Sequence, residues 1–177
     1  MPAALHLCRL GYTYLDDIAD YNPDTNILTG IFLRSLRRLN PELDETGSHQ
    51  MLDKIVGMLR NDDLGREFYA LLSANSGLKL VDFENADNNE WHVTTEFTCE
   101  NSDTGDSFRP DITCFVNGLP LAFIEVKKPN NHDGILAERD RINRRMSNKA
   151  FRRFINITQL MIFSNNQEYD NDNRVPI

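Results

Sequence analysis

The chain has 177 residues, enough for one domain with a sizeable buried core. Hydrophobic residues make up 40% of it and charged residues 26%, which is typical of a globular protein and excludes a disordered or fibrous one. No apolar run is long enough to cross a membrane and no signal peptide is recognised, so we expect a cytoplasmic protein. Three cysteines without metal-like spacing favour reduced core residues: Cys8, Cys99 and Cys114.

Residues 1–77 are predicted to be mostly helical. A first helix ends at Gly11, where a glycine suits the left-handed stop, and a second helix ends at Asn40-Pro41. Ser48 is a suitable N-cap for a third helix. A fourth helix is expected from Leu64 to Ala74, capped by one of the two preceding acids, Asp62 or Asp63.

Residues 78–177 are predicted to form the sheet core. Apolar and polar residues alternate from Trp91 to Glu100, which is typical of a half-buried strand. Polar turns are expected at 101–107 and 165–174. A helix from Ile135 to about Ser147 is followed by a buried strand from Thr158 to Ser164. Three apolar side chains of that helical stretch are expected to face inward: Ile142, Met146 and Ala150. This order predicts an α/β fold with a mixed β-sheet flanked by helices.

The sheet core is organised around a hairpin at residues 108–128. Asn117-Gly118 separates two β-rich runs, Asp111–Val116 and Leu121–Lys127, and is a strong hairpin signal because both residues tolerate positive φ. The second run is almost wholly apolar until Glu125 and Lys127. Side chains alternate along a strand, so these two charged residues share one face.

The hairpin is predicted to contain an irregularity. A regular two-residue turn would pair position 116 with 119, and therefore Asp111 with residue 124. Asp111 and Glu125 would then point to opposite faces of the sheet. We therefore expect a three-residue connection or a β-bulge, which restores the common face.

Asp111, Glu125 and Lys127 form a Pro-Asp…Glu-x-Lys pattern that resembles the PD-(D/E)xK nucleases. The resemblance implies a restriction-endonuclease-like core in which Asp111 and Glu125 bind Mg²⁺, a hard cation that prefers oxygen ligands. It also implies the backbone carbonyl of Val126 as a further ligand. Lys127 would orient the attacking water and stabilise the transition state. The alternative is a chance match in which Glu125 is a solvated edge charge.

Net charge is −8, although nine Lys or Arg face three acids between positions 127 and 153. This basic segment predicts contact with the DNA backbone, and the alternative is a solvated helix face. Four residues are expected to bind DNA: Lys128, Arg141, Arg145 and Lys149. The last three are spaced four residues apart and would form a ladder along one side of the helix. Glu67 and Glu96 are interpreted as surface carboxylates, and His92 is assigned no role.

More of the chain resembles the N-terminal endonuclease region of the restriction (R) subunit of type I restriction-modification enzymes. The matching segments are Leu10-Gly-Tyr12, Arg37–Pro41, Gly65–Leu72, Asn88–Val93 and, most specifically, Arg109–Lys127. The resemblance implies one Mg²⁺-dependent nuclease domain over residues 1–177, a piece of a larger chain. An ATP-driven motor in the same polypeptide and separate modification and specificity subunits are implied as partners, with double-stranded DNA as substrate.

Two features depart from that family. No acid precedes Asp16, so we expect the carboxylate that related nucleases carry on the first helix to be absent. The helix after Lys127 lacks a Gln-x-x-x-Tyr motif and has Arg141 and Arg145 at the corresponding positions, where they suit phosphate contact. Two other functions stay open: a different PD-(D/E)xK repair or junction nuclease, and a non-catalytic docking or regulatory module. Little sequence preference is expected, because no base-reading helix is present.

Overall fold

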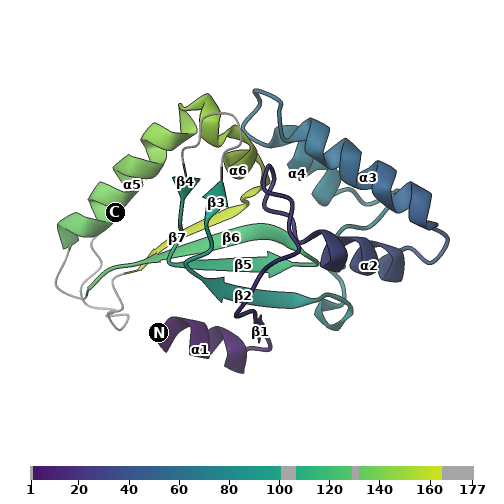
Figure 1. Cartoon of the computed structure of the whole chain (residues 1–177), viewed down its shortest axis with the longest axis horizontal. Helices are drawn as coiled ribbons and strands as arrows, with labels where there is room; N and C mark the ends of the chain where they lie inside the picture. The colour runs from purple at the N-terminus through teal and green to yellow at the C-terminus, as the bar shows by residue number, and fades with distance from the viewer. Residues whose placement is uncertain (1, 101–106, 129–131, 165–177) are drawn as a thin grey trace.

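The computed structural model describes residues 2–100, 107–128 and 132–164 and has a mixed α/β fold (Figure 1). The larger sheet has the order β1-β2-β5-β6-β7: β1 (Thr13–Tyr14), β2 (Trp91–Thr95), β5 (Ile112–Val116), β6 (Leu119–Val126) and β7 (Leu160–Ser164). A small second sheet pairs β3 (Cys99–Glu100) with β4 (Ser107–Phe108). The helices are α1 (Pro2–Arg9), α2 (Thr29–Leu39), α3 (Glu45–Met58), α4 (Arg66–Leu72), α5 (His132–Met146) and α6 (Arg152–Ile157), with short 3₁₀ turns η1 (Ala86–Asn88) and η2 (Lys149–Phe151).

The five-stranded sheet is mixed, as predicted. β2, β5 and β6 are antiparallel neighbours, whereas β1 runs parallel to β2 and β7 runs parallel to β6. Two adjacent parallel strands require a crossover connection, and α5, η2 and α6 provide it between β6 and β7. The end of β6, which carries Glu125 and Val126, therefore leads into this crossover.

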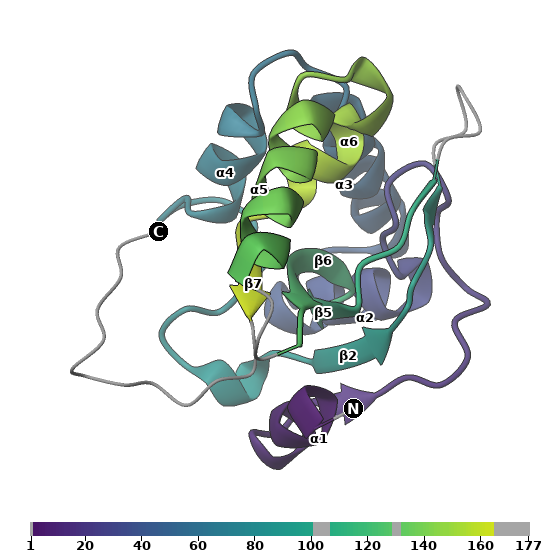
Figure 2. The ribbon, with the colours of Figure 1, turned by 90° about the vertical axis from the view of Figure 1, so that its left-hand side faces the viewer.

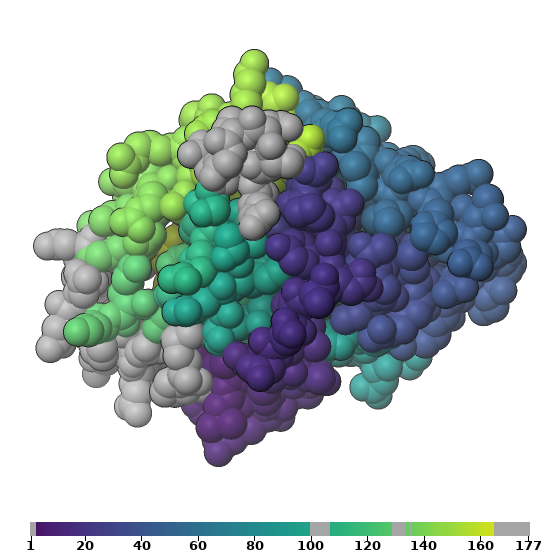
Figure 3. All heavy atoms as spheres, in the orientation of Figure 1, coloured from purple at the N-terminus to yellow at the C-terminus, as the bar shows by residue number. Residues whose placement is uncertain are grey.

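Helices cover both faces of this sheet (Figure 2). On one face, residues of α1 pack against the strands in a small cluster: Ala3, Leu7 and Cys8 with Val93, Ile112 and Cys114. On the other face, α5 and α6 contribute to a larger aromatic cluster: Phe108, Phe115, Phe123, Ile142, Phe154 and Ile155. The segment between β1 and α2, dark purple in Figure 3, packs against this second cluster and lies between the strands and the helical layer.

The helical layer of α2, α3 and α4 packs at the turn end of the hairpin. Its buried cluster includes Phe32, Leu36, Ile55, Leu59 and Phe68, together with Val116 and Leu119 from the hairpin. These apolar residues recur at helical spacing, which is why the sequence predicts the helices correctly. The turn of the hairpin is thereby enclosed by helices rather than exposed at the edge of the sheet.

The start of α3 differs from the prediction. Asp44, not Ser48, is the N-cap, and its Oδ1 accepts a hydrogen bond from the Gly47 amide at 2.7 Å. Ser48 lies inside the helix and donates its hydroxyl to the carbonyl of Glu45 at 2.7 Å. Both residue types cap helices well, so local preference alone does not decide between them. The N-cap of α4 is Gly65, in the left-handed conformation and without a side-chain cap hydrogen bond, so the prediction of Asp62 or Asp63 as the cap is wrong. Asp63 lies two residues earlier, and its carboxylate accepts from the amides of Gly65 at 3.0 Å and Glu67 at 2.8 Å.

The predicted strand from Trp91 to Glu100 is broken in two. Glu96 adopts a φ of 55°, which ends β2, and its amide donates to the carbonyl of Asp111 at 3.1 Å. Beyond the break, Cys99 and Glu100 pair in the second sheet. Phe97 and Cys99 are buried on the far side of the break. The apolar alternation therefore continues across a change of sheet and does not reveal it.

All three cysteines are free. Burial raises the pKa of the Cys114 thiol to about 11 and raises that of Cys99 further, so both are unreactive at neutral pH. Within the described residues, every helix is too short or too polar to span a membrane. The polar turns expected at 101–107 and 165–174 lie outside the part that the structure describes, apart from Ser107, which is the first residue of β4.

Candidate active site

The central hairpin contains the predicted β-bulge. β5 pairs with β6 as Phe115↔Pro120 near the turn but as Cys114↔Ala122 beyond it, so Leu121 is an extra residue on β6. Proline lacks a ladder donor and is tolerated beside a bulge. The expected irregularity is therefore confirmed.

The bulge brings the two predicted acidic ligands to one face of the sheet. Beyond Leu121 the register pairs Ile112 with Ile124, so Asp111 is opposite Glu125. Side chains of directly opposed residues lie on the same face. Without the extra residue, Asp111 would be opposite Ile124 and would face away from Glu125.

The turn of the hairpin is Asn117-Gly118, with φ values of 51° and 80° as a two-residue turn of this kind requires. The Asn117 side chain is buried and fully engaged. Its Nδ2 donates to the carbonyl of Leu80 and to Asn89 Oδ1, both at 2.9 Å, and its Oδ1 accepts from the amide of Glu90 at 2.8 Å. Asn117 therefore fixes the hairpin to the loop that precedes β2.

Gly118 lies against the start of α2. Its carbonyl accepts from the amide of Leu28 at 2.9 Å. A Cβ at position 118 would lie 2.7 Å from the carbonyl oxygen of Leu28 and 2.7 Å from the amide nitrogen of Phe32. Only glycine fits this close approach of two backbones, so the turn and the helix hold each other in place.

Asp111 and Glu125 differ in environment. Asp111 is partly exposed, and its Oδ2 accepts a hydrogen bond from the amide of Val126 at 2.7 Å, which fixes the carboxylate beside β6. Glu125 is only 6% exposed. Burial, and then repulsion from Asp111 and Glu138, raises the pKa of Glu125 to about 7. Two neighbouring acids that repel each other, one of them buried, favour a bound cation.

Lys127 lies between two carboxylates on the same face. Its Nζ is 3.8 Å from Glu125 Oε2 and 3.0 Å from Glu138 Oε1. Glu138 comes from α5, is 4% exposed, and also pairs with Arg141 Nη1 at 2.8 Å. Glu138 is not among the site residues predicted from the sequence. Its spacing of four residues from Ile142, an inward-facing position, is the signal that could have found it.

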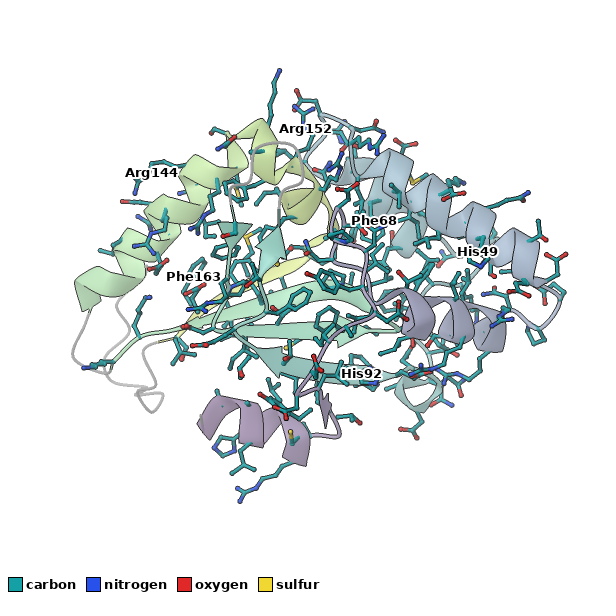
Figure 4. The ribbon with its side chains drawn as sticks, viewed as in Figure 1. His49, Phe68, His92, Arg144, Arg152 and Phe163 are labelled. Atoms are coloured by element: carbon teal, nitrogen blue, oxygen red, sulfur yellow. The ribbon has the colours of Figure 1, made fainter. Side chains whose placement is uncertain are left out.

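Of the residues predicted to bind DNA, Arg145 lies deepest. Its guanidinium is 4.0 Å from the centre of the Phe108 ring, and its Nη1 is buried without a hydrogen-bond partner. Both Glu125 and Glu138 attract it. Figure 4 shows Arg144, by contrast, on the outer side of α5, with Phe163 of β7 beneath the helix. Arg145 therefore points toward the acidic face, with its Nη1 enclosed by protein.

The other three predicted DNA contacts are spread out. Lys128 is exposed just beyond β6, and Arg141 is held by Glu138. Lys149 does not continue an α5 ladder, because α5 ends at Met146 and Lys149 lies in η2. There it lines a hollow of about 250 Å³ with other cations: Arg60, Arg152 and Arg153. The predicted inward orientation of Met146 is also wrong, since its side chain is 39% exposed.

The residues interpreted as structural stay outside the site. Glu67 is exposed on α4 and accepts a hydrogen bond from Asn61. Glu96 is exposed near Arg109. His92 is buried and burial lowers its pKa. Within residues 2–100, 107–128 and 132–164, no three His, Cys, Asp or Glu side chains are grouped closely enough to hold a metal ion. Asp111 and Glu125 are two candidate ligands, one fewer than such a group contains.

Comparison with known proteins relates the chain to the same family as the sequence motifs do. Residues 1–170 match the family model described as "Type I restriction enzyme R protein N terminus". The chain is 30% identical over 155 residues to the type I restriction enzyme MjaIXP endonuclease subunit of Methanocaldococcus jannaschii, a match that covers 73% of this chain and 15% of that protein. It is 32% identical over 114 residues to the type I restriction enzyme HindI endonuclease subunit of Haemophilus influenzae, over 54% of this chain and 10% of that protein.

The matched region is thus a small fraction of each relative's length, whereas the family model covers almost the whole of this chain. The Asp111–Lys127 hairpin and the helices around it lie inside the matched residues. The chain therefore belongs to the family of type I restriction enzyme R protein N-terminal regions.

Proposed function

We propose that this chain is the DNA-cleaving module of a type I restriction enzyme and hydrolyses phosphodiester bonds of double-stranded DNA. The observation that carries the proposal is the bulged hairpin, which sets Asp111 and Glu125 on one face with Lys127 beside them. Family membership and the names of the relatives, which are endonuclease subunits, support the same class of reaction. On this proposal the sheet is a PD-(D/E)xK core.

Asp111 and Glu125, with the backbone carbonyl of Val126, are proposed to hold Mg²⁺. The residues fit such an ion, because Mg²⁺ takes carboxylate oxygens and keeps several of its waters, so two acids are enough. When bound, the ion lowers the pKa of a water and neutralises charge on the phosphoryl oxygens. The raised pKa of Glu125 supports this role, since a cation between the two acids would relieve their repulsion.

Lys127 is proposed to orient the attacking water and to donate to the developing charge on the phosphoryl group. Its ammonium is already on the acidic face, 3.8 Å from Glu125 Oε2. Arg145 is proposed to contact the phosphate beside it, because its guanidinium lies near the two carboxylates and the residue is only partly buried. Lys128, Arg141 and Lys149 would follow the backbone further out. Contacts of this kind are indifferent to base sequence, so little sequence preference is expected.

The remaining steps of restriction are proposed to lie outside these residues. An ATP-driven motor in the same polypeptide would move the DNA, and modification and specificity subunits would read the recognition sequence. The net charge of −8 supports such a division, because an acidic chain binds DNA weakly by itself and needs its substrate delivered.

One observation favours a second function, a non-catalytic docking or regulatory module. α1 carries no acid and packs on the face opposite Glu125, and no third carboxylate in the described residues completes a metal cluster. A module of this kind would keep the fold and couple the motor to the partner subunits. It would not depend on Asp111.

Two measurements separate these functions. Titration of the chain with Mn²⁺ by calorimetry should show a site in the wild type that is lost in Asp111→Ala and kept in Asp53→Ala, an exposed acid of α3. In the full-length subunit assembled with its partners, Asp111→Ala and Lys127→Ala should stop plasmid cleavage with Mg²⁺ and ATP while ATP hydrolysis continues. Cleavage that persists in both variants would support the docking function instead.

A further inference from the structure

Glu138 is the one residue of α5 in direct contact with Lys127, according to the ion pairs of the described residues. The ammonium of Lys127 is 3.0 Å from Glu138 Oε1 and 3.8 Å from Glu125 Oε2. It therefore forms a close ion pair with Glu138 and only a loose one with Glu125. Two carboxylates compete for one cation, and the one on the helix has the shorter contact.

The Glu138 carboxylate is suited to this competition by its surroundings. It is 4% exposed, so it moves little and water screens it weakly. Its Oε1 also accepts Arg141 Nη1 at 2.8 Å, which gives the buried charge a second partner. Two charged donors hold this buried carboxylate in place.

We propose that Glu138 is a positioning residue that holds the Lys127 ammonium away from Glu125. Glu125 is then free to bind a divalent cation, and Lys127 stays at the side of that cation instead of on its ligand. The proposal rests on the proposed metal role of Asp111 and Glu125. It assigns a function to a carboxylate outside the Pro-Asp…Glu-x-Lys pattern.

The physical reason is that an ammonium and a metal ion compete for the same carboxylate oxygens. Without Glu138, the nearest anion to Lys127 is Glu125, which is itself buried and has no closer cationic partner among the ion pairs of the described residues. Lys127 has a flexible stem and would move onto Glu125. A divalent cation would then have to displace it.

The test is a set of Mn²⁺ titrations by calorimetry on the chain. Glu138→Gln should weaken Mn²⁺ binding by about tenfold, the size expected for coupling between contacting charged residues. The double variant Glu138→Gln with Lys127→Met should bind within about twofold of the wild type. The matched control is Asp140→Asn, which removes one charge from an exposed acid of the same helix and should leave binding unchanged.

A third variant separates position from charge. Glu138→Asp keeps the negative charge but withdraws the carboxylate by one methylene, so it should weaken Mn²⁺ binding by about threefold, and Lys127→Met should restore it. This variant also serves if Glu138→Gln fails to fold, which thermal melts of each variant would show.

Several results would overturn the proposal. Wild-type affinity in both Glu138 variants would show that Lys127 does not need to be held. Weak binding that Lys127→Met fails to restore would show that Glu138 acts through its own charge. If the wild type binds no Mn²⁺, or if Asp111→Ala binds it equally well, the metal role of Asp111 and Glu125 falls and this inference falls with it. The first two results leave that metal role intact.

Discussion

The replacement Glu125→Gln is expected to make the metal-free chain more stable at pH 8. Burial, followed by repulsion from Asp111 and Glu138, raises the pKa of Glu125 from an ordinary 4.5 to about 7. The folded chain therefore keeps a proton that the unfolded chain has already lost between these two values. The contribution of this proton to the free energy of unfolding is fully present below about pH 4.5. It is lost as the pH rises through about 7, so the wild type becomes less stable over this range. A neutral glutamine removes this dependence.

The expected size follows from the two pKa values. A tenfold change in proton affinity corresponds to about 1.4 kcal/mol, so ionising Glu125 costs the folded chain about 3 kcal/mol above pH 7. This is a large part of the stability of a typical domain. Glu125 is buried, so screening by water reduces the figure little.

The assay is urea unfolding in a chelating buffer at several pH values from 4.5 to 8.5. The difference in unfolding free energy between wild type and Glu125→Gln isolates the contribution of this one carboxyl. Glu42→Gln, at an exposed glutamate before α3, is the control and should follow the wild type. Adding Mn²⁺ at pH 8 should restore stability to the wild type alone, because a ligand bound only by the folded state stabilises it. Parallel curves for wild type and Glu125→Gln would refute the reasoning.

Three further outcomes are expected. Gly118→Ala should destabilise the chain by about 3 kcal/mol in urea unfolding, because a positive φ and two backbone contacts of 2.7 Å oppose a Cβ. Gly57→Ala in α3 is the control and should not destabilise the chain, because its Cβ would meet open space. Equal effects of the two variants would contradict this. Deleting Leu121 should weaken Mn²⁺ binding on the order of a hundredfold, because it would turn Asp111 and Glu125 to opposite faces of the sheet. Circular dichroism should confirm that the sheet persists. Unchanged binding would show that the metal site does not depend on the bulge. Arg145→Ala should weaken DNA binding by about tenfold in fluorescence anisotropy and reduce the dependence of that binding on salt. Arg144→Ala, on the outer side of α5, is the control and should have less effect. Similar losses in both variants would argue against a specific role for Arg145.

The hairpin shows how far sequence reasoning reaches. Asn117-Gly118 predicts the turn, and the requirement that Asp111 and Glu125 share a face predicts the bulge, because both rest on geometry that a few neighbouring residues determine. The location of the bulge at Leu121 could not be predicted from the sequence, since an extra residue at any of several positions would bring Asp111 and Glu125 to the same face.

Features that depend on distant packing were missed. The break at Glu96 is hidden because Phe97 and Cys99 continue the apolar alternation into a different sheet. Glu138 resembles an ordinary acid in a basic helix until the crossover brings α5 over β6 and sets it beside Lys127. In both cases a tertiary contact, rather than local propensity, determines the role of the residue.

The burial of the Asn117-Gly118 turn bears on how the chain can be dissected. Hairpin turns are ordinarily surface features that tolerate cutting and insertion, but this one is bonded to the loop before β2 and enclosed by α2. A fragment that begins after α2 would lose the helix that covers the turn and would expose Leu119 and Val116 to water. The sheet that carries Asp111 and Glu125 is therefore not separable from residues 28–36, and a minimal unit for transfer to another protein has to include them.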